Sequence, residues 1–87
     1  RIQKEENSEA LIGISIDKKH RGKSYASKAL KIASEYFLGL NPNFVINAFI
    51  KIENRGSQKA FKNAGFELEN IVEHEKHQSF HYINKIK

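Results

Sequence analysis

Residues 10–26 read ALIGISIDKKHRGKSYA and change character twice. The first seven, 10–16, are mostly apolar and rich in β-branched side chains, and their short length predicts a strand rather than a helix. Because the apolar side chains fall on both faces, we expect this strand to be covered on both sides. Residues 17–23 are polar and basic and contain a glycine, so they predict a loop. An apolar repeat of three and four residues begins after Ser24, which is typical of an amphipathic helix.

The expected helix stops near Gly39, and Pro42 follows shortly after it. A second β-rich run covers residues 44–50. Strand, helix and strand in this order form a βαβ unit, in which the strands are parallel and the crossover is right-handed. The helix should turn one apolar face toward this sheet, formed by Ala26, Ala29, Leu30, Ala33, Tyr36, Phe37 and Leu40.

A second, shorter helix is expected after Asn54, whose side chain is a preferred N-terminal cap. Gly65 should end this helix, because glycine readily adopts the conformation that follows a helix C-terminus. The helix should pack on the sheet through one face, formed by Ser57, Ala60, Phe61 and Ala64.

Two further strands are expected at the C-terminal end. Residues 66–72 predict the first, and Asn70 interrupts its alternation in a way that indicates a β-bulge. A polar turn at residues 74–78 leads into a last strand at 79–86, antiparallel to the one before it. The predicted fold class is therefore α/β (α+β), with a central mixed sheet and the element order β-α-β-α-β-β.

The composition is 39% hydrophobic and 29% charged, which is that of a soluble globular domain. The absence of cysteine excludes disulfides, thiolate nucleophiles and cysteine-ligated zinc. No run approaches the roughly 20 apolar residues of a membrane span, so we expect a cytoplasmic protein without a membrane partner. The net charge of +5 favours anionic partners such as phosphates, nucleotides or nucleic acid.

Residues 21–26, RGKSYA, stand where the first strand passes into the first helix. Backbone N–H groups converge at such a junction, and the helix start adds about half a positive charge. Small residues let an anion approach the backbone closely, and Arg21 and Lys23 add charge. The segment therefore fits a phosphate cradle, and taken alone it fits equally well a solvated basic loop in which Ser24 caps the helix.

One phosphate-binding motif can be excluded directly. Gly22-Lys23-Ser24 matches the end of the P-loop pattern G-x-x-x-x-G-K-[ST]. That pattern needs a glycine five residues before Gly22, and the residue there is Asp17. An acidic side chain is incompatible with the tight, neutral turn that the nucleotide phosphates require, so a P-loop is excluded.

The same segment resembles motif A of the GNAT acetyltransferase superfamily, Q/R-x-x-G-x-G/A. Arg21 takes the first position, Ser24 and Ala26 take the two small positions, and Gly22 matches the additional glycine of the common form RGKG. The resemblance implies that this loop binds the pyrophosphate of acetyl-CoA through its backbone amides. The cofactor contacts implied here are Arg21, Gly22, Lys23, Ser24, Tyr25 and Ala26.

Residues 54–66, NRGSQKAFKNAGF, resemble motif B of the same superfamily, N-x-x-A/S-x-x-L/A-Y/F-x-k-x-G-F. The positions that fall on the pattern are Asn54, Ser57, Ala60, Phe61, Gly65 and Phe66. The two motifs and the order of elements between them extend from Leu11 to Phe66, which is most of the chain. The resemblance implies the GNAT fold and acetyl-CoA as cosubstrate.

Four further residues enter the implied cofactor site. The backbones of Ile14 and Ile16 would pair with the β-alanine and pantetheine amides of CoA, and Asn54 would contact the CoA arm in addition to capping its helix. Phe61 stands where many members carry a tyrosine that is the usual candidate for protonating the departing thiolate. A phenyl ring cannot donate a proton, but a thiol with a pKa of about 8.5 can leave largely as thiolate without help.

No residue is assigned as catalytic from the sequence. Glu9 is a candidate general base, although an exposed charge at a strand end is the preferred interpretation. His20 could meet a phosphate, and His81 is not assigned. His74 and His77 resemble metal ligands, but no third and fourth ligands stand at a convincing spacing, so we expect no metal.

The expected function is acetyl-CoA-dependent N-acetylation of a primary amine, for which we favour a small molecule such as an amino sugar. A non-catalytic CoA-binding or interaction domain of the same fold is one alternative. A basic nucleic-acid-binding module is another, but the lysines are scattered and no aromatic-interleaved basic strand is present. We therefore expect no nucleic-acid partner.

Residues 1–87 are expected to form one partial GNAT domain, from the cofactor strand to the C-terminal hairpin, with the N-terminal strands missing. The chain contains no methionine, which indicates a fragment. The first strand would then present an open edge, which favours a homo-oligomer that pairs through it. A hairpin within residues 1–16 is the alternative way to shield that edge.

Overall fold

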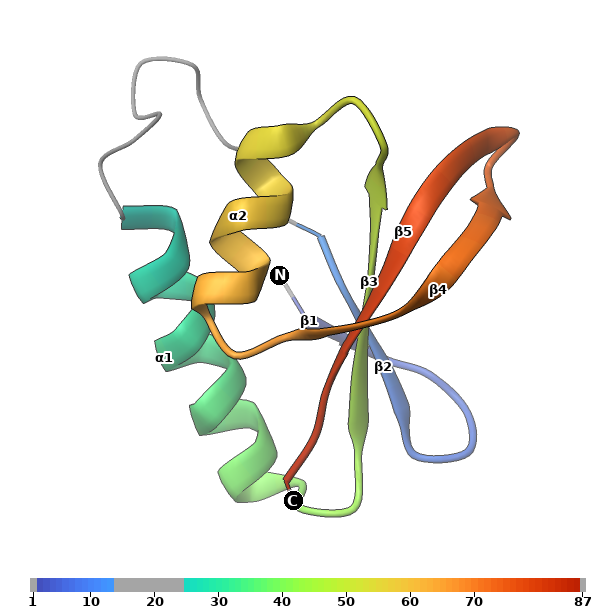
Figure 1. The fold of residues 1–87 in the computed structure, drawn as a ribbon. Helices are drawn as coiled ribbons and strands as arrows, with labels where there is room; N and C mark the ends of the chain where they lie inside the picture. Colours follow the sequence, from blue (N-terminus) through green and yellow to red (C-terminus); the bar gives the residue numbers. More distant parts are fainter. Residues whose placement is uncertain (1, 14–24, 87) are drawn as a thin grey trace.

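The computed structural model describes residues 2–13 and 25–86 (Figure 1). The elements within these residues are, in chain order, β1 (Ile2–Lys4), β2 (Glu9–Ile12), α1 (Tyr25–Leu40), β3 (Val45–Lys51), α2 (Arg55–Asn63), β4 (Glu67–His74) and β5 (His77–Asn84). The predicted order of strands and helices is confirmed, and a short strand, β1, precedes it. The C-terminal part of the first predicted strand, residues 14–16, lies outside the described residues.

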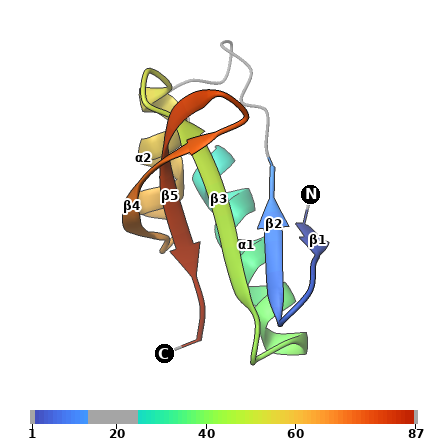
Figure 2. The ribbon, with the colours of Figure 1, turned by 90° about the vertical axis from the view of Figure 1, so that its right-hand side faces the viewer.

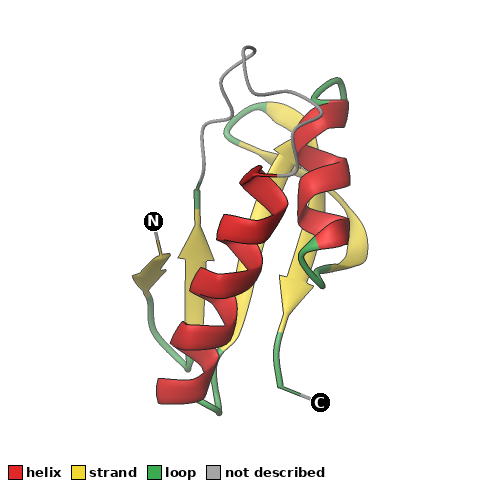
Figure 3. Cartoon of the chain, turned by 90° about the vertical axis from the view of Figure 1, so that its left-hand side faces the viewer, coloured by secondary structure: helices red, strands yellow, loops and turns green. Residues whose placement is uncertain are grey.

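The described strands form one sheet in the order β1-β2-β3-β5-β4. β2 and β3 are parallel, as the βαβ prediction requires, and the other neighbours are antiparallel. Both helices lie on the same face of the sheet, where Figure 3 shows them side by side. Figure 2 looks onto the opposite face, which neither helix covers.

The core fills the space between the helices and the sheet. β3 contributes Ile46, Ala48 and Ile50, each at most 5% exposed. β2 contributes Ala10 and Ile12 to the same side. The other buried apolar side chains are Leu30, Leu38, Ala60, Phe61, Ala64, Phe66 and Tyr82. This alternation is what a sheet covered on one face produces.

The expectation that the first strand is covered on both faces is wrong. Ala10 and Ile12 of β2 are buried, whereas Glu9 and Leu11 are only partly covered. The physical reason is that α1 and α2 both lie on one side of the sheet, so the other side of β2 has no layer over it in the described residues.

The predicted inner face of α1 is correct for Ala26, Leu30 and Phe37, and wrong for Ala29, Ala33, Tyr36 and Leu40. The helix packs through Leu30, Ser34 and Leu38, while Tyr36 is 72% exposed. Successive residues turn by about 100° around a helix, so a line of side chains displaced by one or two positions no longer faces the sheet. The spacing of apolar residues does not reveal which face of α1 packs, because the polar Ser34 occupies the centre of the packed face.

The prediction for α2 is confirmed. The Asn54 side-chain oxygen accepts a hydrogen bond from the Ser57 backbone N–H at 3.1 Å and so caps the helix. The buried face comprises Ser57, Ala60, Phe61 and Ala64. Gly65 ends the turn after the helix with a φ of +99°, a conformation that other residues rarely adopt.

The turn of the C-terminal hairpin is shorter than predicted, because the prediction assigned residues 74–78 to it. His74 pairs with His77, and the turn consists of Glu75 and Lys76, both with positive φ. The predicted bulge is confirmed, because Leu68 pairs with Tyr82 while Asn70 pairs with the next residue, His81, which leaves one residue of β4 without a partner in the register.

The expectation that the first predicted strand has an open edge is wrong. β1 folds back on β2 as an antiparallel strand, with Ile2 opposite Ile12 and Lys4 opposite Ala10. The alternative, a hairpin near the N-terminus, is what the structure contains, with a turn through Asn7 and Ser8 in left-handed conformation. Self-association of the chain stays a prediction, and the argument from an unpaired edge no longer supports it.

Candidate functional site

The two parallel strands separate partway along their length. β2 and β3 pair through Glu9–Val45, Ala10–Ile46 and Leu11–Asn47 only. Beyond this point β3 continues to Lys51 and pairs with β5, while Ile12 of β2 pairs with β1. In the described residues, the side of β3 that faces β2 therefore has no strand partner beyond Asn47.

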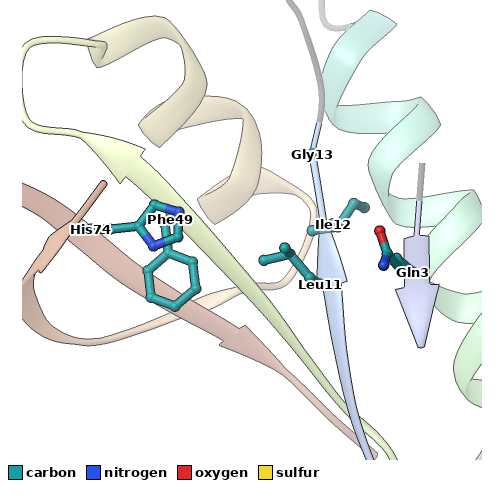
Figure 4. Close-up of a pocket in the computed structure, with 6 residues that line it drawn as sticks. All are labelled: Gln3, Leu11, Ile12, Gly13, Phe49 and His74. Atoms are coloured by element: carbon teal, nitrogen blue, oxygen red, sulfur yellow. The ribbon is translucent and has the colours of Figure 1, made fainter. Parts of the chain in front are cut away.

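A cavity of about 340 Å³ lies at this separation. Its lining residues come from four strands and are Gln3, Leu11, Ile12, Gly13, Phe49 and His74. Figure 4 shows His74 and Phe49 on the β3 side of the cavity, and Leu11 and Ile12 on β2 with Gly13 directly after them. The separation of β2 and β3 is thus a place that a ligand can enter.

Both helices begin at the edge of the sheet where β2 and β3 end (Figure 1). The first turns of α1 and α2 contain no acidic residue. Helix N-termini carry backbone N–H groups without intrahelical partners and a partial positive charge. The edge beside the cavity is therefore electrostatically suited to an anionic group such as a phosphate.

Most of the predicted cofactor contacts cannot be placed. Ile14, Ile16, Arg21, Gly22, Lys23 and Ser24 lie outside the described residues. Tyr25 is the first residue of α1, and Ala26 is half-buried against the core. Both therefore stand at the start of α1, and their contacts with CoA stay predictions.

The remaining two predicted contacts are in α2 and its cap. Asn54 is exposed at the sheet edge, and its Oδ1 accepts the capping hydrogen bond. Phe61 is 2% exposed and packs edge-to-face against Phe66, with ring centroids 5.0 Å apart. Phe61 thus belongs to the core in the described residues, and the CoA contact of either residue stays a prediction.

A hydrogen-bonded network that the sequence analysis missed crosses three strands beside the cavity. Asn47 Nδ2 donates to Glu9 Oε1 at 2.8 Å and to the Ala10 carbonyl oxygen at 3.2 Å. Asn47 Oδ1 and His81 Nε2 are 2.7 Å apart. A signal was present, because Asn47 interrupts the apolar run of β3, and a buried amide requires hydrogen-bond partners.

The network determines which nitrogen of His81 carries a proton. Glu9 Oε1 and the Ala10 carbonyl only accept hydrogen bonds, so the Asn47 amide nitrogen must face them. Asn47 Oδ1 therefore faces His81 and can only accept, which requires a proton on His81 Nε2. In the neutral imidazole, the lone pair is then on Nδ1.

Three stacked rings connect this network to the cavity. The Phe49 ring is parallel to that of His81 at a centroid distance of 4.7 Å and to that of His74 at 4.2 Å. Phe49 and His74 line the cavity, and His81 is hydrogen-bonded to Asn47.

Glu9, the candidate base of the sequence analysis, accepts a hydrogen bond from Asn47. It belongs to the network and is not a simple exposed charge.

Three further features of residues 2–13 and 25–86 concern metal binding, membrane crossing and titration. No group of three or more His, Asp or Glu side chains lies close enough in this part of the chain to hold a metal ion. No described helix has the length and apolar character that crossing a membrane would require. Burial raises the pKa of the Tyr82 phenol, which lies in the core on the helix side and not at the cavity.

The sequence profile of the acetyltransferase (GNAT) domain matches residues 1–67, which is more than half of the chain. The chain therefore belongs to the GNAT acetyltransferase family. Among curated protein sequences, no relative is found for it.

Solved structures with the same fold are GNAT enzymes of low sequence identity. The ribosomal-protein-S5-alanine acetyltransferase from Vibrio fischeri is 16% identical, with a TM-score of 0.82 over 95% of this chain and 49% of its own. A GNAT-family acetyltransferase from Bacillus anthracis is 21% identical, with a TM-score of 0.81 over 97% and 55%. The aminoglycoside acetyltransferase AAC(6′)-Ib, in complex with paromomycin and acetyl-CoA, is 17% identical, with a TM-score of 0.78 over 94% and 47%. The chain thus spans about half the length of these structures.

Proposed function

We propose that this chain forms the cofactor-binding half of an acetyl-CoA-dependent N-acetyltransferase that acts on a primary amine. The observation that carries the proposal is the separation of β2 and β3 beside the cavity. An extended ligand that contains amides can pair with exposed strand backbone as an added strand does. The pantetheine arm of CoA has this character, and its pyrophosphate would lie toward the edge where both helices begin.

The proposed reaction is direct attack by a neutral amine on the thioester carbonyl. A backbone N–H of β2 or the residues after it would polarise that carbonyl, since fixed dipoles stabilise the developing oxyanion without reorganisation. The cavity walls position the amine, because holding two reactants together removes much of the entropic barrier. Phe61 offers no proton to the leaving thiolate, so that group would leave unprotonated or take a proton from the amine.

For the acceptor we propose a small molecule such as an amino sugar. The cavity wall combines the flat Phe49 and His74 rings with the amide of Gln3, a set that suits an apolar ring face bearing polar substituents. The presence of an aminoglycoside acetyltransferase among the structural neighbours supports this class. A protein terminus is the competing acceptor, and one structural neighbour is a ribosomal-protein-S5-alanine acetyltransferase.

The test uses the intact protein that carries this chain. Calorimetric titration should show CoA binding that weakens as salt rises, because exposed charges are screened over about 8–10 Å at physiological ionic strength. Release of free CoA thiol from acetyl-CoA should require an added amine, with amino sugars preferred over alanine-terminated peptides. CoA binding without thiol release for any amine would indicate a non-catalytic domain, and absence of CoA binding would contradict the proposal altogether.

A further inference from the structure

Resting on that proposed function, we propose that His81 is the general base of the reaction and that Asn47 is its positioning residue. The proposed acid–base site is the network Glu9–Asn47–His81 on the uncovered face of the sheet. In many unrelated enzymes, the base that activates a nucleophile is oriented by a second residue through a hydrogen bond.

The strand register places this network on the same face of the sheet as the cavity. Leu11 of the cavity lies opposite Asn47, and Phe49 of the cavity lies opposite His81. Cross-strand partners project to the same face, and so do residues two apart along a strand. The network is therefore on the face that the helices leave open, directly beside the point where β2 and β3 separate.

In its neutral form, His81 has the tautomer that a base requires. Its Nε2–H donates a hydrogen bond to Asn47 Oδ1, so in the neutral ring Nδ1 carries the lone pair. Within the described residues, Nδ1 has no hydrogen-bond partner. The side chain is only partly buried, so an amine can reach it. Histidine is also the side chain whose ordinary pKa lies near neutral pH.

The two other candidates for the base are less suitable. Glu9 already accepts a hydrogen bond from Asn47 through Oε1. His74 stands at the end of the β4–β5 hairpin, and its Nε2 lies 3.9 Å from the Glu75 carboxylate. His74 is therefore assigned to the cavity wall, where it stacks on Phe49.

The network can also stabilise the protonated base. When Nδ1 takes a proton, Nε2 keeps its hydrogen bond to Asn47, and Asn47 keeps its bond to the Glu9 carboxylate. The positive charge on His81 is then linked through one amide to a negative charge. The face of the Phe49 ring, stacked on the imidazole, favours a cation as well.

The proton and electron balance of the step is complete without another reactant. The acceptor enters as an ammonium ion and gives one proton to His81 Nδ1. The neutral nitrogen attacks the thioester carbonyl carbon, so that the N–C bond forms and the C–S bond breaks. The second nitrogen proton goes to the thiolate to give CoA thiol, and the proton on His81 returns to solvent.

The decisive variant is His81→Gln. The glutamine amide nitrogen can occupy the position of Nε2 and keep the hydrogen bond to Asn47, but it cannot accept a proton. We expect kcat to fall by about 100-fold or more with KM changed little, which is the ordinary scale of general-base catalysis. The matched control is His77→Gln, at an exposed residue beside the hairpin turn, which should leave both constants unchanged.

A pH profile separates a base from a structural residue. The loss in His81→Gln should shrink as the pH approaches the pKa of the acceptor amine, because a neutral amine needs no base. Besides His81, the titratable or charged side chains of the described strands that project to this face are Glu9, Lys51, Glu67, His74 and His77. Because His77 is the control position, the pH profile of His77→Gln must match that of the wild type. A loss that stays constant with pH would overturn the base assignment.

The role of Asn47 is tested by the tautomer of His81. Nitrogen-15 NMR of the wild-type protein should show the Nε2-protonated form, a measurement that needs neither substrate nor a variant. In Asn47→Leu the tautomers should mix, and kcat should fall by about tenfold. An Nδ1-protonated His81 in the wild type would overturn the proposal whether or not the variant folds.

The outcomes distinguish this proposal from the proposed function. If the wild type transfers acetyl groups and His81→Gln transfers them equally fast, the acetyltransferase function stands and the base assignment is wrong. If the wild type binds CoA but transfers to no amine, the proposed function fails and the base role fails with it.

Discussion

On the face of the sheet that the helices cover, β3 contributes Ile46, Ala48 and Ile50, whereas on the opposite face the same strand contributes Asn47 and Phe49. The covered face is held by apolar burial, which is non-directional and roughly proportional to the apolar area removed from water. The open face is held by hydrogen bonds and stacked rings with defined directions. Alternate residues of one strand thus serve stability and the candidate site separately, so substitutions on the two faces should have different consequences.

The largest effect on stability is expected on the covered face. Ile46 is fully buried, so Ile46→Ala should lower the free energy of unfolding by about 2–5 kcal/mol, through lost apolar contact and the cavity left behind. The control is Ile32→Ala on the solvent side of α1, where the side chain is 69% exposed. Urea unfolding of both variants measures the difference, and equal losses would contradict the assignment of the covered face.

The next largest effect is expected in the proposed phosphate cradle, residues 21–26, which is a prediction from the sequence. Gly22→Val should block the approach of the CoA pyrophosphate to the backbone and weaken CoA binding tenfold or more, which is about 1.4 kcal/mol. Gly39→Val is the control, because a Cβ at Gly39 meets nothing within 4 Å. Calorimetric titration of CoA into both variants checks the cradle, and unchanged affinity in Gly22→Val would exclude it.

The covered face should also show a characteristic response to alkaline pH. Burial raises the pKa of Tyr82 above 10.0, so the unfolded chain loses this proton first as the pH rises. The stabilising contribution is fully present below pH 10 and is lost above it, by at most about 1.4 kcal/mol per pH unit. Urea unfolding at several pH values should show a smaller alkaline loss in Tyr82→Phe, and an unchanged loss in Tyr36→Phe at the exposed Tyr36.

The smallest effect concerns a polar atom on the covered side. Ser34 Oγ is buried without a hydrogen-bond partner in the described residues. Ser34→Ala should therefore raise the free energy of unfolding by about 1 kcal/mol, from relief of desolvation and a better helix propensity. The reverse change at an exposed position of the same helix, Ala33→Ser, should lower it by about 0.5 kcal/mol. A destabilised Ser34→Ala would contradict this expectation.

By itself the sequence determined the order of strands and helices, the cap and inner face of α2, the bulge in β4 and the family. The family rests on two motifs between Leu11 and Phe66, and the other features depend on residues close together in the chain. Asn54 and Ser57 lie three positions apart, and Gly65 follows its helix directly. Local conformational preference and the period of apolar residues are sufficient to predict such features.

The tertiary structure alone decided which stripe of α1 packs, that β1 covers the edge of β2, and that Glu9, Asn47 and His81 meet. Asn47 is 38 positions from Glu9 and 34 from His81, so no local pattern connects them. α1 carries two apolar stripes with similar spacing, and only the position of the sheet chooses between them. Parallel pairing of β2 with β3 and antiparallel pairing of β3 with β5 bring these side chains to one face, because strand register is set by long-range contacts.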